Sequence, residues 1–208
     1  MRYRILAVAI VFVTTLAMNA GATTITYTDI GDGSGTLNGV PFSDSTFTIT
    51  ATSDTSNRQS YGSGYFIDNI SASIDISGLG TYTFVTGTRF FVNNNYSGIG
   101  MVGFSHAGIN GSDLYNGPIN SAFATWNMLS SIGPIAGTNS SLYNFTNVYI
   151  TNYVNMFTLD FDNNPSVNGT FTAVVGTTPP IGAPEPATML LLGLGLMGLA
   201  GVRRKFKK

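Results

Sequence analysis

The sequence contains no cysteine, which excludes disulfide bonds and thiolate chemistry. Charged residues are also scarce, at 9% of the 208 residues. Between residues 23 and 178 there is no lysine and no glutamate, and two arginines stand against nine aspartates, a net charge of −7. Because phosphate binding needs clustered lysine and arginine, this acidic middle excludes a role in nucleic-acid binding.

The first 22 residues have the layout of a secretory signal peptide. Arg2 and Arg4 precede an apolar stretch from Ile5 to Met18, and the run 20–22 (Ala-Gly-Ala) supplies the small residues of a cleavage site. The competing interpretation is a permanent anchor, but the apolar stretch is short and ends in small residues. We therefore expect export through the translocon and removal of residues 1–22 by signal peptidase, outside the cytoplasm.

A second apolar segment lies near the other end of the chain. Residues 187–202 carry no charge, and as a helix rising about 1.5 Å per residue they would reach about 24 Å, short of a hydrocarbon core of about 30 Å. The run 203–208 is basic and begins with Arg203, Arg204 and Lys205, which the positive-inside rule keeps in the cytoplasm. We expect a transmembrane helix at 187–202, with the polar domain on the outer side of the inner membrane.

Residues 177–186 form a proline-rich linker that ends in Pro184, Glu185 and Pro186. Proline fixes φ and disfavours helix in the residue before it, so the linker should be extended. The order of a Pro-Glu-Pro motif, an apolar run and a basic end resembles the PEP-CTERM sorting tail of Gram-negative bacteria, also titled "ice-binding protein C-terminal". The resemblance is confined to residues 184–208.

This resemblance implies a processing route and says little about the middle of the chain. It implies that an exosortase, an integral-membrane cysteine transpeptidase, cleaves near the Pro-Glu-Pro motif and releases or transfers the protein. It also implies that the protein occurs in a bacterium that produces exopolysaccharide. The expected localisation is an anchored inner-membrane precursor that becomes a cell-surface or extracellular protein.

Residues 23–176 have the alternation typical of an all-β domain. In 46–52, Phe47, Ile49 and Ala51 alternate with threonines, and β-branched and aromatic runs recur at 24–28, 70–76, 80–85, 88–92, 145–151, 156–162 and 169–175. Asn38-Gly39 is typical of a two-residue hairpin turn. We expect one antiparallel β-sandwich or jelly roll, with a short helix or irregular crossing over 119–131.

Two residue pairs invite a catalytic interpretation. Ser105 and His106, the only histidine, could act as nucleophile and base. Asp160 and Asp162 share a strand face and could act as paired carboxylates. However, adjacent strand residues such as Ser105 and His106 point to opposite faces, and strand ends favour aspartate for turns. We expect no catalytic residues, and a secreted hydrolase is the least favoured alternative.

The stretch from Asp29 to Gly35 offers a metal-binding alternative. Asp29, Asp32 and the glycines around them supply the hard oxygen ligands that calcium prefers, although the EF-hand spacing is missing. The sequence leaves open a structural calcium site at Asp29 and Asp32 or an ordinary Asp-Gly turn. No other cofactor is expected.

The expected function is a non-enzymatic, surface-sorted or secreted domain that associates with matrix polysaccharide or other envelope components. Its surface is rich in hydroxyl and amide groups, and its candidate sugar-stacking residues are Tyr61, Tyr65, Tyr96 and Tyr143. The alternative is a protein that binds ice or another regular surface through threonine rows, namely Thr46, Thr48, Thr50 and Thr52 with the shorter Thr24, Thr26 and Thr28. The β-propensity of threonine on a solvent face explains such rows equally well.

Overall fold

The computed structural model describes residues 23–108, 112–142, 148–162 and 167–176. They belong to one compact unit, Thr23–Thr178. The predicted signal peptide (1–22), linker (177–186), transmembrane helix (187–202) and basic tail (203–208) lie outside the described residues. Within the described ranges, no helix is long and apolar enough to span a membrane.

The described chain consists of β-strands joined by turns and short 3-10 helices. The strands are β1 (Thr24–Leu37), β2 (Val40–Asp54), β3 (Gln59–Tyr61), β4 (Gly64–Ile76), β5 (Gly80–Phe84), β6 (Thr88–Asn93), β7 (Met101–His106), β8 (Asp113–Ile119), β9 (Ile132–Leu142), β10 (Val148–Thr151), β11 (Met156–Phe161) and β12 (Val167–Val175). The 3-10 helices are η1 (Thr55–Asn57), η2 (Tyr96–Gly98) and η3 (Ser121–Ala124).

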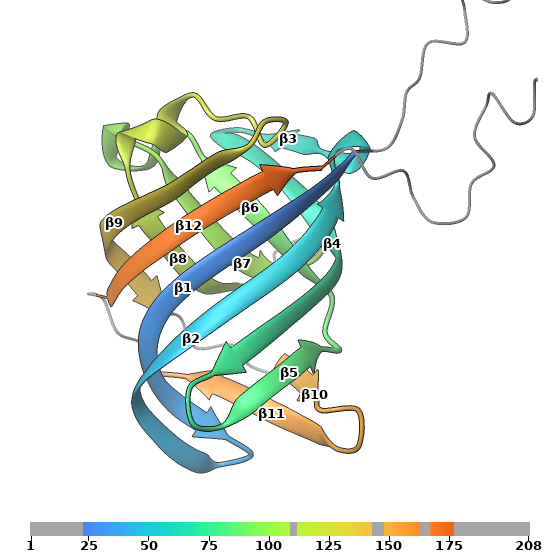
Figure 1. Cartoon of the computed structure of the whole chain (residues 1–208). Coiled ribbons are helices and arrows are strands. Elements are labelled where there is room, and N and C mark those ends of the chain that lie inside the picture. The colour runs from blue at the N-terminus through green and yellow to red at the C-terminus, as the bar shows by residue number, and fades with distance from the viewer. Residues whose placement is uncertain (1–22, 109–111, 143–147, 163–166, 177–208) are drawn as a thin grey trace, which may run out of the picture. The chain divides into compact units, whose positions relative to one another are not determined.

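The strands form one antiparallel sheet with the order β11-β10-β5-β4-β2-β1-β12-β9-β8-β7-β6, and β3 pairs with β4. Two further pairings close this sheet, because β4 also pairs with β6 and β11 also pairs with β1. The first residues of β4 pair with β6, whereas its last residues pair with β2 and β5. The sheet therefore curls over, and Figure 1 shows β1, β2 and β12 crossing in front of β6, β7 and β8.

This arrangement confirms the predicted all-β, antiparallel class and differs from a sandwich of two separate sheets. The two facing layers are parts of one continuous sheet. β9 pairs with β12 in one layer and with β8 in the other, and β4 makes the second passage between the layers. Strands twist and bend readily, so a long strand can leave one layer and enter the next.

The core lies between the two layers and is rich in aromatic rings. On β2, Phe47, Ile49 and Ala51 are buried, as their alternation predicts. Rings meet across the core, with centroids 4.6 Å apart for Tyr27 and Phe90. Such ring pairs contribute about 0.5–1.5 kcal/mol each beyond the area that they bury.

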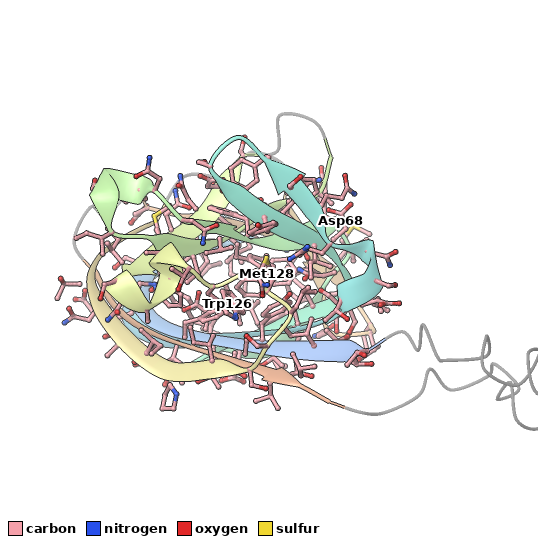
Figure 2. The ribbon with its side chains drawn as sticks, turned by 90° about the horizontal axis from the view of Figure 1, so that it is seen from above. Asp68, Trp126 and Met128 are labelled. Carbon is pink, nitrogen blue, oxygen red and sulfur yellow. The ribbon has the colours of Figure 1, made fainter. Side chains whose placement is uncertain are left out.

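One end of the core is filled by the segment for which the sequence predicts a short helix or an irregular crossing. It forms the single turn η3 and then runs irregularly to β9. Phe123, Trp126 and Met128 are buried, and Figure 2 shows the last two in the interior of the curled sheet. The indole Nε1 of Trp126 donates to the Ser130 carbonyl oxygen at 2.8 Å, so its polar atom is satisfied inside the core.

The predicted hairpin turn at Asn38-Gly39 is confirmed. β1 ends at Leu37 and β2 begins at Val40, and the two turn residues have φ of 52° and 76°. Positive φ at both positions is the requirement of a type I′ turn. The Asn38 Oδ1 also accepts from the backbone N–H of Thr158 at 2.9 Å, which joins the turn to β11.

The two ends of the described domain lie side by side. Ile25 pairs with Val175 in the β1–β12 ladder, and the N–H of Gly176 donates to the Thr24 carbonyl oxygen at 2.8 Å. Figure 1 shows β1 starting where β12 ends. The β1–β12 ladder therefore brings the first and last described strands of the domain together.

Candidate functional site

A groove lies on the outer face of β6, β7 and β8, on the side away from the core. Its volume is about 740 Å³, within the range of about 300–1,000 Å³ that is usual for small-molecule sites. Outward residues of these strands form its floor, because the alternate residues Phe90, Val92 and Phe104 point into the core. β3, the start of β4 and η2 contribute its rim.

Aromatic rings line the rim of the groove. Tyr61 on β3 and Tyr96 on η2 are each 38% exposed, and Phe66 and Phe91 are half-buried beside them. The Tyr61 hydroxyl donates to the Val92 carbonyl oxygen at 3.0 Å, and this bond fixes the ring against β6. Partly exposed, anchored rings of this kind offer flat apolar faces at little cost in side-chain entropy.

The floor depends on a glycine. A Cβ on Gly103 of β7 would collide with the ring of Phe91 and would come within 2.7 Å of Asn116 Oδ1. The absence of a side chain therefore lets the Phe91 ring and the Asn116 amide lie over β7. Ser105, further along β7, is also buried.

Polar atoms on β8 face this floor. The Asn116 Nδ2 donates to Asp113 Oδ2 at 2.8 Å. Asn116 is 8% exposed, and its Oδ1 has no hydrogen-bond partner among the described residues. Burial raises the pKa of Asp113, and the hydrogen bond from Asn116 partly offsets that rise. The site thus presents a carboxyl group held by the Asn116 amide, whose own oxygen is buried without a donor among the described residues.

Arg89 of β6 supplies the positive charge of the groove. Its Nε lies 2.9 Å from Asp68 Oδ1, and its guanidinium stands 4.2 Å from the centroid of the Phe66 ring. The side chain of Arg89 is 15% exposed and that of Asp68 is 48% exposed; Asp68 is labelled in Figure 2. Because this arginine is already paired with a carboxylate, the groove has no excess of positive charge.

The structure separates the two residues that the sequence proposed as calcium ligands. Asp29 is fully buried, whereas Asp32 is exposed and its Oδ1 accepts from Thr46 Oγ1 at 2.7 Å. Residues three apart on a strand point to opposite faces, so these carboxylates cannot hold one ion together. Among the described residues, no three His, Asp, Glu or Cys side chains gather as a metal site.

The Asp-Gly stretch is a strand, so the alternative of an ordinary Asp-Gly turn is also wrong. Residues 29–35 belong to β1 and pair with β2 on one side. A Cβ on Gly31 would lie 2.9 Å from the Phe47 ring, and a Cβ on Gly35 would collide with the Asp160 carbonyl oxygen. Gly31 gives room for a core ring, and Gly35 gives room for the neighbouring strand β11. The stretch is therefore rich in glycine although it is a strand, and a glycine-rich sequence is also typical of a loop.

The residues considered for catalysis are not gathered into a cleft. Ser105 is buried and His106 is half-buried, and the Ser105 hydroxyl donates weakly to the His106 carbonyl oxygen at 3.4 Å. Adjacent strand positions point their side chains to opposite faces, as the sequence predicts. Asp160 is the residue before the last of β11, and Asp162 follows the end of that strand. None of these four except Ser105 lines the groove.

The threonine rows lie on the outer face of the sheet and continue across strands. Thr28 on β1 pairs with Thr50 on β2 and with Thr172 on β12, and Thr50 pairs with Ser73 on β4. Ser73 pairs in turn with Thr83, and Thr83 with Thr151. The sequence shows hydroxyls along single strands, and the register adds a row of hydroxyls that crosses six strands.

Two of the four tyrosines that the sequence proposed for sugar stacking line the groove, namely Tyr61 and Tyr96. Tyr65 lies elsewhere, under the guanidinium of Arg58 at 4.4 Å, and Tyr143 is outside the described residues. Sequence reasoning missed Arg89, Asp113 and Asn116. The alternation of Arg89, Phe91 and Asn93 on one face of β6 is a signal for the floor, but only the strand register joins it to β8.

Comparisons with known proteins bear on the end of the chain. No curated protein and no solved structure matches the sequence. The family model of the PEP-CTERM protein-sorting motif matches residues 183–205. This segment includes the Pro184, Glu185 and Pro186 motif and the start of the basic run at Arg203, Arg204 and Lys205. Residues 183–205 therefore carry a PEP-CTERM protein-sorting motif, which marks an exported protein that is anchored as a precursor and processed by an exosortase for the surface or for release.

Proposed function

We propose that this chain is the precursor of a non-enzymatic protein that associates with the exopolysaccharide or envelope matrix of a Gram-negative bacterium. The observation that carries the proposal is the sorting motif at 183–205. Residues 1–22 direct export and are removed, and residues 23–176 form the outer domain. Residues 187–202 anchor the precursor in the inner membrane, and residues 203–208 remain in the cytoplasm.

In this proposal the extended linker 177–186 presents the Pro-Glu-Pro motif to the exosortase outside the membrane. Proline stiffens the linker, and an extended backbone without internal hydrogen bonds is accessible to a protease. The apolar segment is short for a permanent span, which suits a transient anchor. After cleavage the domain passes to the cell surface or to the medium.

The non-enzymatic part of the proposal is supported by the general character of sorting-tail proteins, which are substrates of exosortase. It is also supported by the placement of Ser105 and His106 on opposite strand faces. The association with polysaccharide is supported by the low positive charge of the domain and by the partly exposed tyrosines of the groove. These features suit hydroxyl-rich ligands better than anionic ones.

The test of this proposal is a Glu185→Ala substitution in the full chain, expressed in its host. We expect the wild type to lose residues 187–208 and to leave the inner membrane, and the variant to keep the tail and stay there. Mass measurement of the mature protein and cell fractionation distinguish the two outcomes. A host strain without exosortase is the matched control and should give the result of the variant. Wild-type protein that retains the tail in the inner membrane would show that a plain anchor operates instead.

A second candidate is binding to ice or another regular surface through the hydroxyl row that crosses β12, β1, β2, β4, β5 and β10. The register that aligns Thr172, Thr28 and Thr50 favours it. Twist between neighbouring strands, roughly 20–25° per pair, turns such a row out of one plane. We therefore rank it second. Inhibition of ice recrystallisation by the wild type, lost in Thr50→Tyr and retained in Tyr96→Ala, would reverse this order.

A further inference from the structure

We propose that the groove on the outer face of β6, β7 and β8 is a saccharide-binding site for neutral, hydroxyl-rich glycan units. This inference deepens the proposed function and rests on it, because an association with matrix polysaccharide needs a site on the domain. Three features of the groove carry it, namely its apolar rings, its oriented carboxyl group and its charge.

The rings fit the apolar faces of sugar units. Tyr61 and Tyr96 stand at the rim, each 38% exposed, and Phe66 and Phe91 continue the apolar surface into the groove. The C–H groups on one face of a pyranose pack against such rings, whereas its hydroxyls project from the edges. The hydrogen bond from the Tyr61 hydroxyl to Val92 holds that ring in place before a ligand arrives.

The polar atoms fit the edges of the same ligand. The Asp113 carboxyl lines the groove and would accept from a sugar hydroxyl. The Asn116 Nδ2 donates to Asp113 Oδ2 at 2.8 Å and so holds this carboxyl in a fixed orientation before a ligand arrives. Asn116 Oδ1 is itself buried, so it lies beneath the surface that a ligand would contact.

The charges favour a neutral ligand over an acidic one. Arg89, the cation that lines the groove, is paired with Asp68 at 2.9 Å, and Asp113 adds a further carboxyl group. Residues 23–178 carry a net charge of −7. A uronic-acid polymer would therefore meet a repelling field, whereas a neutral chain would not.

The test uses the full chain purified in detergent and exopolysaccharide from its host. The polymer is partly hydrolysed and separated by anion exchange into neutral and acidic oligosaccharides, and binding to each is measured by titration calorimetry. We expect binding to the neutral fraction, weakened about three- to tenfold by Tyr96→Ala and by Tyr61→Ala, as the loss of one ring contact predicts. The matched control is Tyr149→Ala, because Tyr149 is also 38% exposed but does not line the groove.

Thermal melting of each variant separates lost binding from lost folding, and Tyr96 is a partly exposed rim residue outside the buried core. Binding to the acidic fraction alone, binding to protease-sensitive matrix proteins alone, or equal affinities for the wild type and both rim variants would each overturn the inference. Co-sedimentation with whole exopolysaccharide tests the proposed function separately. Wild type and rim variants that co-sediment equally would keep the matrix association and remove this site from it.

Discussion

Substitution of Asp29 by asparagine is expected to stabilise the domain at neutral pH. Asp29 lies inside the core on β1 with no exposed surface, flanked in the ladder by Ile49 and Phe171. Neither carboxyl oxygen has a hydrogen-bond partner among the described residues. Burial alone raises the pKa of Asp29 well above its ordinary value, because nothing in the core stabilises the charged form.

The sign of the pH effect follows from this raised pKa. Below the unfolded pKa of about 3.9 the carboxyl is neutral in both states and burial carries no ionisation penalty. Above it the unfolded chain ionises while the folded carboxyl stays neutral, so stability falls as pH rises up to the folded pKa. The slope is about 1.4 kcal/mol per pH unit over that window. Asparagine cannot ionise, so the unfolding free energy of the variant lacks this dependence on pH.

The assay is urea unfolding followed by the fluorescence of Trp126, the only tryptophan, which is 5% exposed in the folded state. The unfolding free energies of wild type and Asp29→Asn are compared from about pH 3.5 upward, starting below the unfolded pKa. We expect similar values at the lowest pH and a widening advantage for the variant above about pH 4. Asp44→Asn, on an exposed aspartate, controls for the change in net charge. A difference that stays constant with pH, or a wild type that is the more stable at neutral pH, would refute the reasoning.

Two further substitutions test local features of the fold. Asn38→Ala is expected to cost about 1–3 kcal/mol, because alanine is strained at the φ of 52° and the backbone N–H of Thr158 loses its acceptor; urea unfolding measures this, and an unchanged midpoint would contradict it. Gly103→Ala is expected to cost about 1–3 kcal/mol by overpacking against Phe91. Its matched control is Gly87→Ala, where the new Cβ would make an ordinary contact at 3.6 Å from Ala107. Equal unfolding midpoints for the two glycine variants would exclude this account of the groove floor.

The strands with clear alternation were predictable from the sequence. β2 shows Phe47, Ile49 and Ala51 on one face and threonines on the other, and the structure buries the first set. β8 and β9 were not predictable, because Gly117-Pro118 and Gly133-Pro134 interrupt them. They form strands because β8 pairs with β7 and β9 pairs with β12. Such pairing joins residues that are distant in the sequence, so it cannot be predicted from a short stretch of sequence.

The same distinction applies to the candidate site. Tyr61 and Tyr96 could be named from the sequence as candidate sugar-stacking residues. Asn116 could not, because its place in the groove depends on its pairing with Gly103 in the β7–β8 ladder. The spacing of Asp29 and Asp32 suggested a shared ion in a loop. Once that stretch is a strand, the same spacing sends the two carboxylates to opposite faces.

The adjacency of the domain's two ends bears on the order of events during secretion. β1 is the first strand to emerge, and its ladder with β12 joins residues such as Ile25 and Val175 that lie at opposite extremes of the domain sequence. A topology dominated by such distant pairings folds slowly, because the intervening chain must be present before the ends can meet. The β1–β12 ladder therefore cannot form until the chain has been made as far as β12, which ends at Val175. The sorting motif begins at residue 183, so the strand that completes the sheet and the signal for processing are neighbours along the chain.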